Sequence, residues 1–358
     1  MFQLEKIVRQ NILNLKAYSS ARDEYSGKDA VFLDANENPF GELNRYPDPH
    51  QTALKEKLGI LKSVNTENIF IGNGSDEVID ITYRTFCEPG RDKALTFSPT
   101  YGMYDVSAAI NNVKLIKIPL TENFQIDFEN LKKYLDDENL KIIFICSPNN
   151  PTGNILKNIE DILQNFKGIV FVDEAYIDFS ETDSYLSKLI SYPNLIISQT
   201  FSKARGLAAA RVGTAFASKE IIDLYNKVKP PYNVSKLNQE AALQSLENGE
   251  EFEINKINIL VQRSFLQNEL SKIKLIKKIY PTDANFMLVE LDDANKVYKE
   301  LVNQKVITRN RNSVVKNSIR ITVGSEDENE KLIEALKAQT NEPPLYPPKE
   351  KEIFKTDF

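Results

Sequence analysis

The 358-residue sequence contains a single histidine, and this scarcity excludes several kinds of active site. His50 alone cannot supply the spaced histidine pairs of a typical zinc site, and a Ser-His-Asp triad would have to use this one residue as its base. It follows the turn-like string Tyr46-Pro47-Asp48-Pro49, where an exposed loop position is expected. We therefore expect no metal site, and if the protein is an enzyme we expect its proton carrier to be another residue type.

Cysteines and long apolar runs are also scarce. Cys87 and Cys146 are the only cysteines, too few for a disulfide framework or a four-thiolate metal site, which favours the reducing cytoplasm. Residues 1–10 mix charged with apolar side chains and do not resemble a signal peptide. No later stretch approaches the roughly 20 apolar residues that a membrane helix requires. These absences predict a cytoplasmic protein without a membrane segment.

The chain has no excess of positive charge. Its 45 Lys and Arg against 51 Asp and Glu give a net charge of −6, so no overall positive field attracts nucleic acid or an anionic membrane. Any anionic ligand must therefore be bound by a local site. The composition, 41% hydrophobic and 27% charged, is that of a globular protein, and the length favours two domains at about 150 residues each.

Short β-branched runs alternate with amphipathic stretches through the middle of the chain, which predicts an α/β fold with a largely parallel sheet. The expected strands are residues 68–71, 93–97, 113–118, 141–146, 168–172, 195–199 and 213–217. Each ends in a loop of polar or turn-forming residues, the place where open α/β sheets bind ligands.

From about residue 238 the pattern changes to long charged helical segments and two further strands, 284–291 and 318–323, which predicts a smaller α+β domain. We divide the chain into an N-terminal segment, a large domain, a small domain and a Pro/Lys/Glu-rich tail that we expect to be extended. The four segments are residues 1–44, 45–237, 238–340 and 341–358. The first is expected to pack on the small domain and the active site.

The tetrapeptide Thr200-Phe201-Ser202-Lys203 follows a predicted strand and precedes a run of small residues. A lysine at the carboxyl end of a buried strand is unusual, because its ammonium normally reaches solvent. Partial burial lowers the pKa of a lysine, and the amine can then form a Schiff base with an aldehyde. Alone, the tetrapeptide is as well explained by an exposed loop.

A carboxylate and a phenol follow the neighbouring predicted strand, in Asp173-Glu174-Ala175-Tyr176. A buried Asp173 can keep the pyridine nitrogen of pyridoxal phosphate (PLP) protonated, and the Tyr176 phenol can form a hydrogen bond with the 3-oxygen of the ring. The structural alternative for Asp173 is a helix N-cap.

A third strand leads into Ser147-Pro148-Asn149-Asn150-Pro151-Thr152-Gly153. Two prolines and a glycine predict a rigid turn, which would hold the Asn150 amide for a second hydrogen bond to the 3-oxygen. Tyr101, in Pro99-Thr100-Tyr101-Gly102, would lie near the same sheet edge and stack on the pyridine, unless it is a core residue.

A phosphate site is predicted where strand 68–71 leads through Gly72-Asn73-Gly74-Ser75 into a helical pattern beginning at Asp76. A strand, a glycine-rich turn and a helix N-terminus together direct backbone N–H groups at a phosphate. The carboxylates of Asp76 and Glu77 would repel a phosphate and are expected to point aside. Asp76 is nevertheless predicted, with Gly74 and Ser75, to be a cofactor-binding residue. Arg211 could pair with the same phosphate, with a surface salt bridge as its alternative role.

Together these motifs resemble the fold-type I aminotransferases, and most closely their histidinol-phosphate branch. The resemblance covers almost the whole chain, and its motifs include Leu33-Asp34-Ala35-Asn36-Glu37-Asn38-Pro39 and Arg320-Ile321-Thr322-Val323-Gly324. It implies a fold-type I PLP-transferase with a large, mostly parallel mixed-sheet domain and a smaller α+β domain. It also implies PLP bound to Lys203, a homodimer, and L-histidinol phosphate and 2-oxoglutarate as substrates, with no nucleic acid or membrane as partner.

The resemblance implies further roles for individual residues. The Thr200 and Ser202 hydroxyls would join Arg211 at the phosphate, and Tyr46 of one subunit would reach the phosphate held by the other. The implied substrate-binding residues are Arg320 for the carboxylate, Arg309 as a second substrate-side arginine, and Tyr18 in the N-terminal segment that closes over the substrate.

Two features depart from the pattern of this family: Arg205 is charged in a usually apolar stretch, and the Pro-rich tail has no counterpart. Three alternative functions share the cofactor motifs. An aromatic amino-acid aminotransferase and a threonine-phosphate decarboxylase use the same PLP residues, and a PLP-fold regulatory or binding protein would lack turnover. Such regulators resemble fusions with an N-terminal DNA-binding domain, whereas here the resemblance begins by residue 17.

Overall fold

The computed structural model describes residues 2–18 and 31–340, which fall into two units. The large unit is Met1–Asn150 with Asn154–Lys256, and the small unit is Pro151–Gly153 with Ile257–Phe358. The boundary lies later than the predicted one after residue 237, because helix α9 (Lys236–Glu247) buries Ala242 and Leu246 in the core of the large unit. The predicted tail, 341–358, lies outside the described residues.

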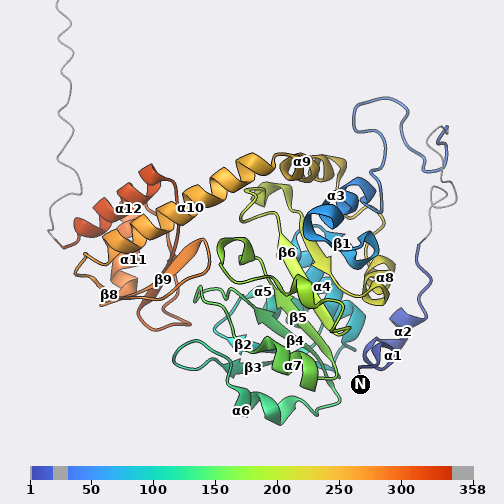
Figure 1. Ribbon diagram of the computed structural model, residues 1–358, viewed down its shortest axis with the longest axis horizontal. Helices are drawn as coiled ribbons and strands as arrows, with labels where there is room; N and C mark the ends of the chain where they lie inside the picture. The colour runs from blue at the N-terminus through green and yellow to red at the C-terminus, as the bar shows by residue number, and fades with distance from the viewer. Residues whose placement is uncertain (1, 19–30, 341–358) are drawn as a thin grey trace, which may run out of the picture. The chain divides into compact units, whose positions relative to one another are not determined.

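A seven-stranded sheet forms the centre of the large unit, in the order β1-β7-β6-β5-β4-β2-β3 (Figure 1). Strand β7 runs antiparallel to both of its neighbours, and the remaining neighbouring strands pair in parallel. The predicted mixed, mostly parallel α/β sheet is therefore confirmed. The strands are β1 (Ile69–Gly72), β2 (Lys93–Ser98), β3 (Lys114–Pro119), β4 (Leu140–Cys146), β5 (Ile169–Asp173), β6 (Leu195–Thr200) and β7 (Gly213–Phe216).

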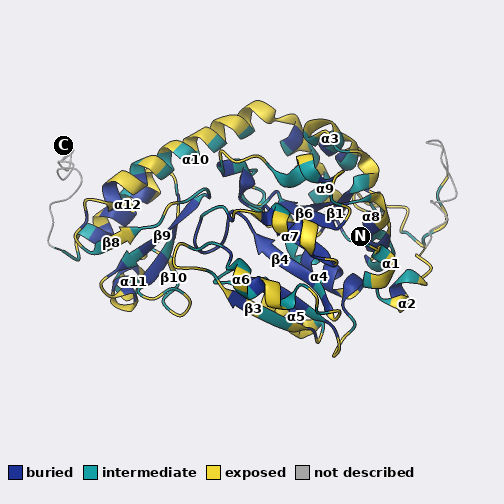
Figure 2. Cartoon of the chain, turned by 60° about the horizontal axis from the view of Figure 1, so that its bottom comes forward, coloured by how far each residue is buried: buried dark blue, intermediate teal, exposed yellow. Residues whose placement is uncertain are grey.

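Helices cover both faces of this sheet, and each face has its own apolar core. The central strands are buried on both sides, as their continuous apolar sequences require, and they are dark blue in Figure 2. Helices α3 (Thr52–Lys62), α6 (Phe128–Leu131), α7 (Ile159–Asn165) and α9 contribute to one core. Helices α1 (Leu4–Ile7), α2 (Gln10–Leu13), α4 (Ser75–Phe86), α5 (Met103–Ile110) and α8 (Lys219–Val228) contribute to the other.

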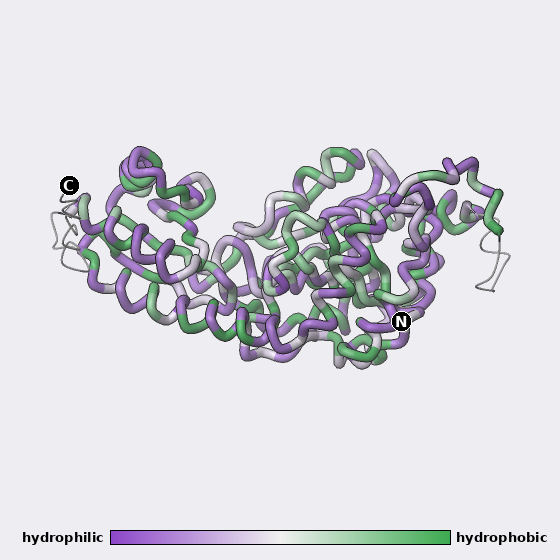
Figure 3. The backbone as a smooth tube through the Cα atoms, turned by 90° about the horizontal axis from the view of Figure 1, so that it is seen from above, coloured by the Kyte–Doolittle hydropathy of each residue, from purple (hydrophilic) through white to green (hydrophobic). Residues whose placement is uncertain are grey.

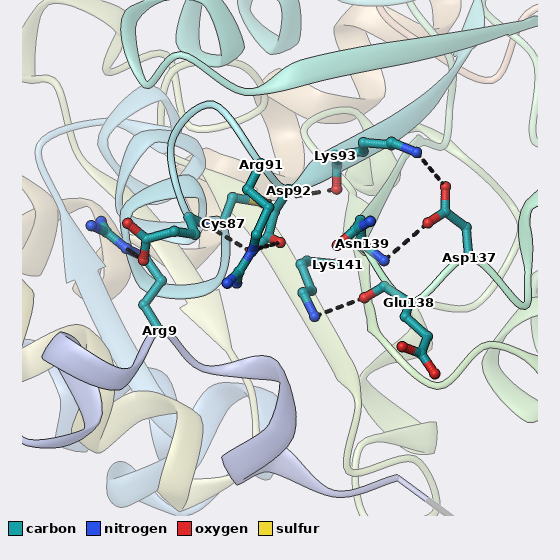
Figure 4. A network of polar contacts seen from close by, with 10 residues as sticks. Arg9, Cys87, Arg91, Asp92, Lys93, Asp137, Glu138, Asn139 and Lys141 are labelled. Atoms are coloured by element: carbon teal, nitrogen blue, oxygen red, sulfur yellow. Dashed lines mark hydrogen bonds and ion pairs between the residues drawn. The ribbon is translucent and has the colours of Figure 1, made fainter.

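The described start of the chain packs on the large unit. Val8 and Ile12 are buried in the second core, and Arg9 pairs with Glu88 at 3.2 Å. Figure 4 shows Arg9 beside a polar network at the amino ends of the strands, where Lys93 contacts Asp137 at 2.7 Å. Charged side chains that pair with each other thus occupy the sheet edge opposite the predicted ligand site.

The small unit is built on an antiparallel sheet in the order β10-β11-β9-β8. Its strands are β8 (Ile276–Ile279), β9 (Phe286–Leu291), β10 (Arg309–Asn310) and β11 (Ser318–Thr322), and its helices are α11 (Ala294–Asn303) and α12 (Glu326–Lys337). Helix α10 (Gly249–Leu270) begins in the large unit and continues into the small one. Figure 3 shows hydrophilic and hydrophobic positions alternating along the helices, as expected for elements with one buried face.

In the part of the chain that the structure describes, no helix is both long enough and apolar enough to cross a membrane.

Candidate active site

The parallel strands bring the predicted site residues to one edge of the large sheet. Strands β1, β2, β4, β5 and β6 all end at this edge, and β7 begins there because it runs in the opposite direction. The loops that follow the five strands and the turn that precedes β7 therefore meet, although they are far apart in the sequence. This topology is what assembles the site.

The lysine loop, which we define as residues 200–206, is closed by its own hydrogen bonds. The Ser202 N–H donates to Thr200 Oγ1 at 3.1 Å, and the Gly206 N–H donates to the Lys203 carbonyl at 3.0 Å. The Phe201 N–H donates across to the Val212 carbonyl, also at 3.1 Å. The Lys203 ammonium lies 5.6 Å from the centre of the Tyr176 ring. The lysine is thus partly buried in a constrained loop rather than on an open surface.

Asp173 ends β5 and is 3% exposed. The Tyr104 hydroxyl donates to its Oδ2 at 2.8 Å, and the Ala175 N–H donates to its Oδ1 at 3.1 Å. Burial raises the pKa of the Asp173 carboxyl to about 6, an effect that these two hydrogen bonds oppose. A cationic ring nitrogen placed beside this carboxylate would relieve the cost of burying its charge.

Asn150 and Tyr176 form a second group of donors in the site. The Asn150 amide nitrogen lies 3.5 Å from the Tyr176 hydroxyl, and both residues are buried. The preceding Asn149 is completely buried and fixes the turn, because its amide donates to the Pro99 carbonyl and accepts from the Thr100 hydroxyl, both at 2.9 Å. The loops after β2 and β4 are thereby bound together.

The turn before α4 forms an anion cradle with Arg211. Gly74 has a φ of +78°, and a side chain at this position would come within 2.7 Å of the Arg211 guanidinium. A Cβ at Gly213 would lie 2.3 Å from the Ser75 nitrogen, so glycine is required where β7 meets the start of α4. The N-terminus of α4 and the Arg211 guanidinium lie close together, and both are groups that bind phosphate.

The two acidic residues after this turn have different surroundings. Glu77 points aside, as expected, and accepts hydrogen bonds from the Asn73 N–H and from the Asn233 amide at 2.8 Å. Asp76 instead faces the site, where it accepts from the Tyr101 hydroxyl at 3.0 Å and pairs with Arg211 at 3.3 Å. Burial and the nearby Asp76 charge raise the pKa of Tyr101, which keeps its phenol protonated.

These groups line a single pocket. Ten of its residues were predicted from the sequence, and Gly74 abuts the pocket through Arg211. The predicted lining residues are Ser75, Asp76, Tyr101, Asn150, Asp173, Tyr176, Thr200, Ser202, Lys203 and Arg211, and the pocket is completed by Cys146 and Ala175.

Tyr104 is a functional residue that the sequence did not reveal. It belongs to the string Pro99 to Tyr104 that carries part of the family resemblance, but no spacing rule assigned it a role. Its ring stacks on Phe144 at 5.0 Å in the second core, and its hydroxyl reaches Asp173 from there. Burial raises the pKa of Tyr104 well above its usual value, so it remains a hydrogen-bond donor.

Two predicted residues of the large unit lie outside the pocket. Tyr46 is 50% exposed and stacks on Tyr232, with ring centres 4.3 Å apart. Tyr18 is 73% exposed and is not among the described residues that line the pocket.

The two predicted substrate arginines lie in the small unit as a cross-strand pair. Arg309 on β10 is directly opposite Arg320 on β11, and the Arg320 guanidinium lies 5.1 Å from the centre of the Phe286 ring. Like charges directly opposite each other on a sheet are destabilising. A bound anion would offset this repulsion.

The donor set fits PLP better than a metal ion. In residues 2–18 and 31–340 no group of three or more His, Cys, Asp and Glu side chains could hold a metal. The pocket does combine an anion cradle, a buried carboxylate, a phenol beside an amide, and a lysine. A phosphate, a ring nitrogen, a ring oxygen and an aldehyde are the four groups of PLP that these would bind.

Comparisons with known proteins agree with the site chemistry. Residues 11–336 match the family described as aminotransferase class I and II. A histidinol-phosphate aminotransferase of Cytophaga hutchinsonii is 52% identical over 345 residues, which span 94% of this chain and 99% of that protein. The crystal structure of the histidinol-phosphate aminotransferase from Clostridium acetobutylicum has a TM-score of 0.77 at 26% identity and covers 84% of this chain and 91% of that one. The enzyme of that name from Sinorhizobium meliloti, solved in complex with pyridoxal-5′-phosphate, has the same fold, with a TM-score of 0.75, 23% identity and coverage of 85% and 90%.

Proposed function

Because the chain belongs to the aminotransferase class I and II family, and within it to the histidinol-phosphate aminotransferases, we propose that it transfers the amino group of L-histidinol phosphate to 2-oxoglutarate. The products are imidazole-acetol phosphate and L-glutamate, in a step of histidine synthesis. The 52% identity to a histidinol-phosphate aminotransferase over nearly the whole chain carries this proposal. The pocket around Lys203 supplies the chemistry.

The cofactor is pyridoxal phosphate, which when bound withdraws electrons from the substrate Cα. Lys203 supplies the amine that bonds its aldehyde. The N-terminus of α4 and Arg211 would bind its phosphate, and Asp173 would keep its ring nitrogen protonated. The remaining pocket residues proposed to contact the cofactor are Gly74, Ser75, Asp76, Tyr101, Asn150, Tyr176, Thr200 and Ser202, joined by Tyr46 of a second subunit.

Lys203 also acts as the proton carrier. When its amine is free, Lys203 would act as the base that takes the proton from the substrate Cα and as the acid that gives it back. Its amine is partly buried in the pocket, 5.6 Å from the centre of the Tyr176 ring. The single histidine of the chain is not needed for this step.

Arg320 is proposed to bind a carboxylate of 2-oxoglutarate, with Arg309 as a second substrate-side arginine and Tyr18 in the segment that closes over the substrate. Both substrates are anionic, and Arg309 and Arg320 are directly opposite each other in the pairing of β10 with β11. The pair explains how a protein of net charge −6 can bind them.

Replacing Arg320 with methionine is expected to raise the KM for 2-oxoglutarate about 100-fold, because a bidentate arginine–carboxylate contact is lost. Steady-state kinetics with each substrate in turn measures the effect. Lys277→Met is the matched control, since Lys277 is an exposed cation of the same unit that pairs with Asp292. Equal KM values in the two variants would remove Arg320 from the substrate site.

A homodimer is proposed as the working form. Large apolar side chains are exposed along residues 31–46, including Val31 and Leu33 at 87% and Phe40 at 82%. Exposed apolar residues gathered along one segment are typical of a protein interface. Tyr46 lies at the end of this segment, as its proposed role at the partner's phosphate requires. We also propose that the protein acts in the cytoplasm, in line with its two buried, unpaired cysteines.

Parallel assays with histidinol phosphate, phenylalanine and threonine phosphate test the proposed substrate. We expect the kcat/KM for histidinol phosphate with 2-oxoglutarate to exceed that for phenylalanine by about 100-fold or more, since a site built around a buried polar contact rejects substrates lacking it. Preferred turnover of phenylalanine would instead identify an aromatic aminotransferase. Release of carbon dioxide from threonine phosphate would identify a decarboxylase. A purified protein that is colourless and shows no shift in visible absorbance on addition of PLP would contradict all three enzyme assignments.

A further inference from the structure

Arg205 lies two residues after Lys203, and its side chain contacts three groups. The guanidinium carbon is 4.2 Å from the centre of the Phe252 ring and 5.7 Å from that of Phe201. Its Nη1 donates to the Ser245 carbonyl at 2.8 Å. These residues all belong to the large unit. The charged residue that departs from the family pattern is therefore half-buried between two aromatic rings rather than facing solvent.

The contacts of Arg205 join two helices at their junction. Ser245 lies in the last turn of α9, where backbone carbonyls have no partner within the helix and a cation is favoured by the helix dipole. Phe252 lies in the first turn of α10, only a few residues further along the chain. The Arg205 guanidinium thus donates a hydrogen bond to a carbonyl group in the last turn of α9 and stacks on an aromatic ring in the first turn of α10.

The environment of Arg205 argues against a simple surface charge. Among the described residues no carboxylate forms a salt bridge with it, and its partners are two rings and a carbonyl. Burial lowers the pKa of its guanidinium, an effect opposed by the more distant Asp178 and Glu253. An arginine stays protonated under any physiological condition, so a buried cation is retained here at a cost.

The lysine loop links Arg205 to Lys203 through its own backbone hydrogen bonds and a side-chain contact. The Leu207 N–H donates to the Phe201 carbonyl and the Gly206 N–H donates to the Lys203 carbonyl, both at 3.0 Å, so the backbone of the loop is closed. Phe201 and Arg205 flank Lys203 by two residues on either side, and their side chains contact each other. The loop is held on the helix junction at Arg205.

We propose that Arg205 is a positioning residue for Lys203, fixing the lysine loop to the junction of α9 and α10. The inference rests on the proposed function of Lys203 as the cofactor-binding lysine. That lysine must leave the cofactor and return in every turnover, and a displacement of about 1 Å is enough to lower a rate about 100-fold. The contacts of Arg205 would fix the position of the lysine loop, and so of the Lys203 amine, although Arg205 itself contacts neither substrate nor cofactor.

The test compares Arg205→Met, Arg205→Lys, Phe252→Leu and the Arg205→Met/Phe252→Leu double variant, each loaded with PLP. We expect Arg205→Met to lower kcat about tenfold while both KM values change less than about twofold, because positioning and not substrate binding is lost. The pH midpoint of the visible absorbance of the bound cofactor, measured without substrate, is expected to shift in the same variant. Arg205→Lys should restore part of both effects, since it keeps the cation.

The double variant tests whether Arg205 acts through Phe252. Its loss of kcat should be smaller than the product of the two single losses, because both substitutions remove one contact. Arg91→Met serves as the matched control: Arg91 is an exposed arginine of the same unit, paired with Asp92 at the opposite sheet edge (Figure 4), and its variant should behave as the wild type. Should Arg205→Met not fold, Arg205→Lys and Phe252→Leu provide the same readouts.

Failure of the positioning role and failure of the proposed function give different results. A wild-type protein whose borohydride-labelled peptide does not contain Lys203 would overturn the proposed function. A wild type labelled at Lys203, together with Arg205 variants whose kcat and absorbance midpoint match those of Arg91→Met, would overturn the positioning role. An Arg205→Met variant that lowers only the melting temperature would overturn it as well, because a purely structural contact would then explain the residue.

Discussion

Replacing Lys203 with alanine is expected to abolish transamination, with a loss of kcat of about 10⁴-fold or more. The substitution removes the amine proposed to bond the cofactor, which is also the proposed base for the Cα proton, and the other described pocket residues offer no second lysine. Assays with histidinol phosphate and 2-oxoglutarate measure the loss. Borohydride reduction followed by peptide mapping is expected to label residue 203 in the wild type and no residue in the variant.

Two controls separate this effect from a general loss of structure. Lys188→Ala removes a partly exposed lysine of the same unit that pairs with Glu160 at 2.9 Å, and it should retain wild-type activity. Lys203→Arg keeps a cation in the loop but cannot bond an aldehyde as a primary amine does, and it should be as inactive as the alanine variant. Substantial turnover by either Lys203 variant would contradict the assignment of this residue.

The site could be predicted from the sequence because its residues directly follow strands. Lys203, Asp173 and Asn150 each lie within a few residues of a strand end, and parallel strands place their carboxyl ends at one edge. A short apolar run followed by a polar loop is readable without knowledge of the tertiary structure. The positions of these residues in the sequence, just after predicted strands, were therefore enough to predict most of the residues that line the pocket.

Tyr104 could not be predicted in the same way. It lies on α5, and its contact with Asp173 depends on how that helix packs against β4 and β5 through Phe144. An aromatic residue on an amphipathic helix is usually a core residue, and Tyr104 is one apart from its hydroxyl. Its hydrogen bond to Asp173 can be recognised only from the three-dimensional packing.

The small unit was predicted less completely for a related reason. Strands β8 and β10 are short and read Ile-Lys-Lys-Ile and Arg-Asn, with charges that do not predict a buried strand. They form because the apolar β9 and β11 supply partners. The alignment of Arg309 with Arg320 depends on that pairing register, which no local pattern specifies.

Replacing Asp173 with asparagine is expected to lower kcat about 1000-fold, since without a buried carboxylate partner the ring nitrogen of the cofactor would not stay protonated and would withdraw electrons less strongly. Asparagine has nearly the same shape and can accept one hydrogen bond from Tyr104 or from the Ala175 N–H, so the fold should persist. It carries no charge and cannot hold a ring nitrogen in its protonated form. Stopped-flow measurement of single turnovers with histidinol phosphate isolates this effect from substrate binding, and a rate within tenfold of wild type would contradict the role of Asp173.

The same substitution is expected to have the opposite effect on the stability of the cofactor-free protein. Burial raises the pKa of Asp173 from 3.8 to about 6, so the folded protein binds this proton more tightly than the unfolded chain does. The wild type therefore loses stability as the pH rises from about 4 through about 6, by at most about 3 kcal/mol for a shift of roughly two pKa units. Asparagine avoids this loss but sacrifices one hydrogen bond, worth about 1 kcal/mol.

Urea unfolding of the two cofactor-free proteins measures the balance. The variant should exceed the wild type in free energy of unfolding by about 1 to 2 kcal/mol above pH 7, and the difference should vanish or reverse below pH 4. A difference that does not change with pH would mean that Asp173 is not the titrating group. A variant with lower activity but a more stable cofactor-free fold is the result expected if the buried Asp173 charge destabilises the folded chain alone. The bound cofactor would then compensate that charge.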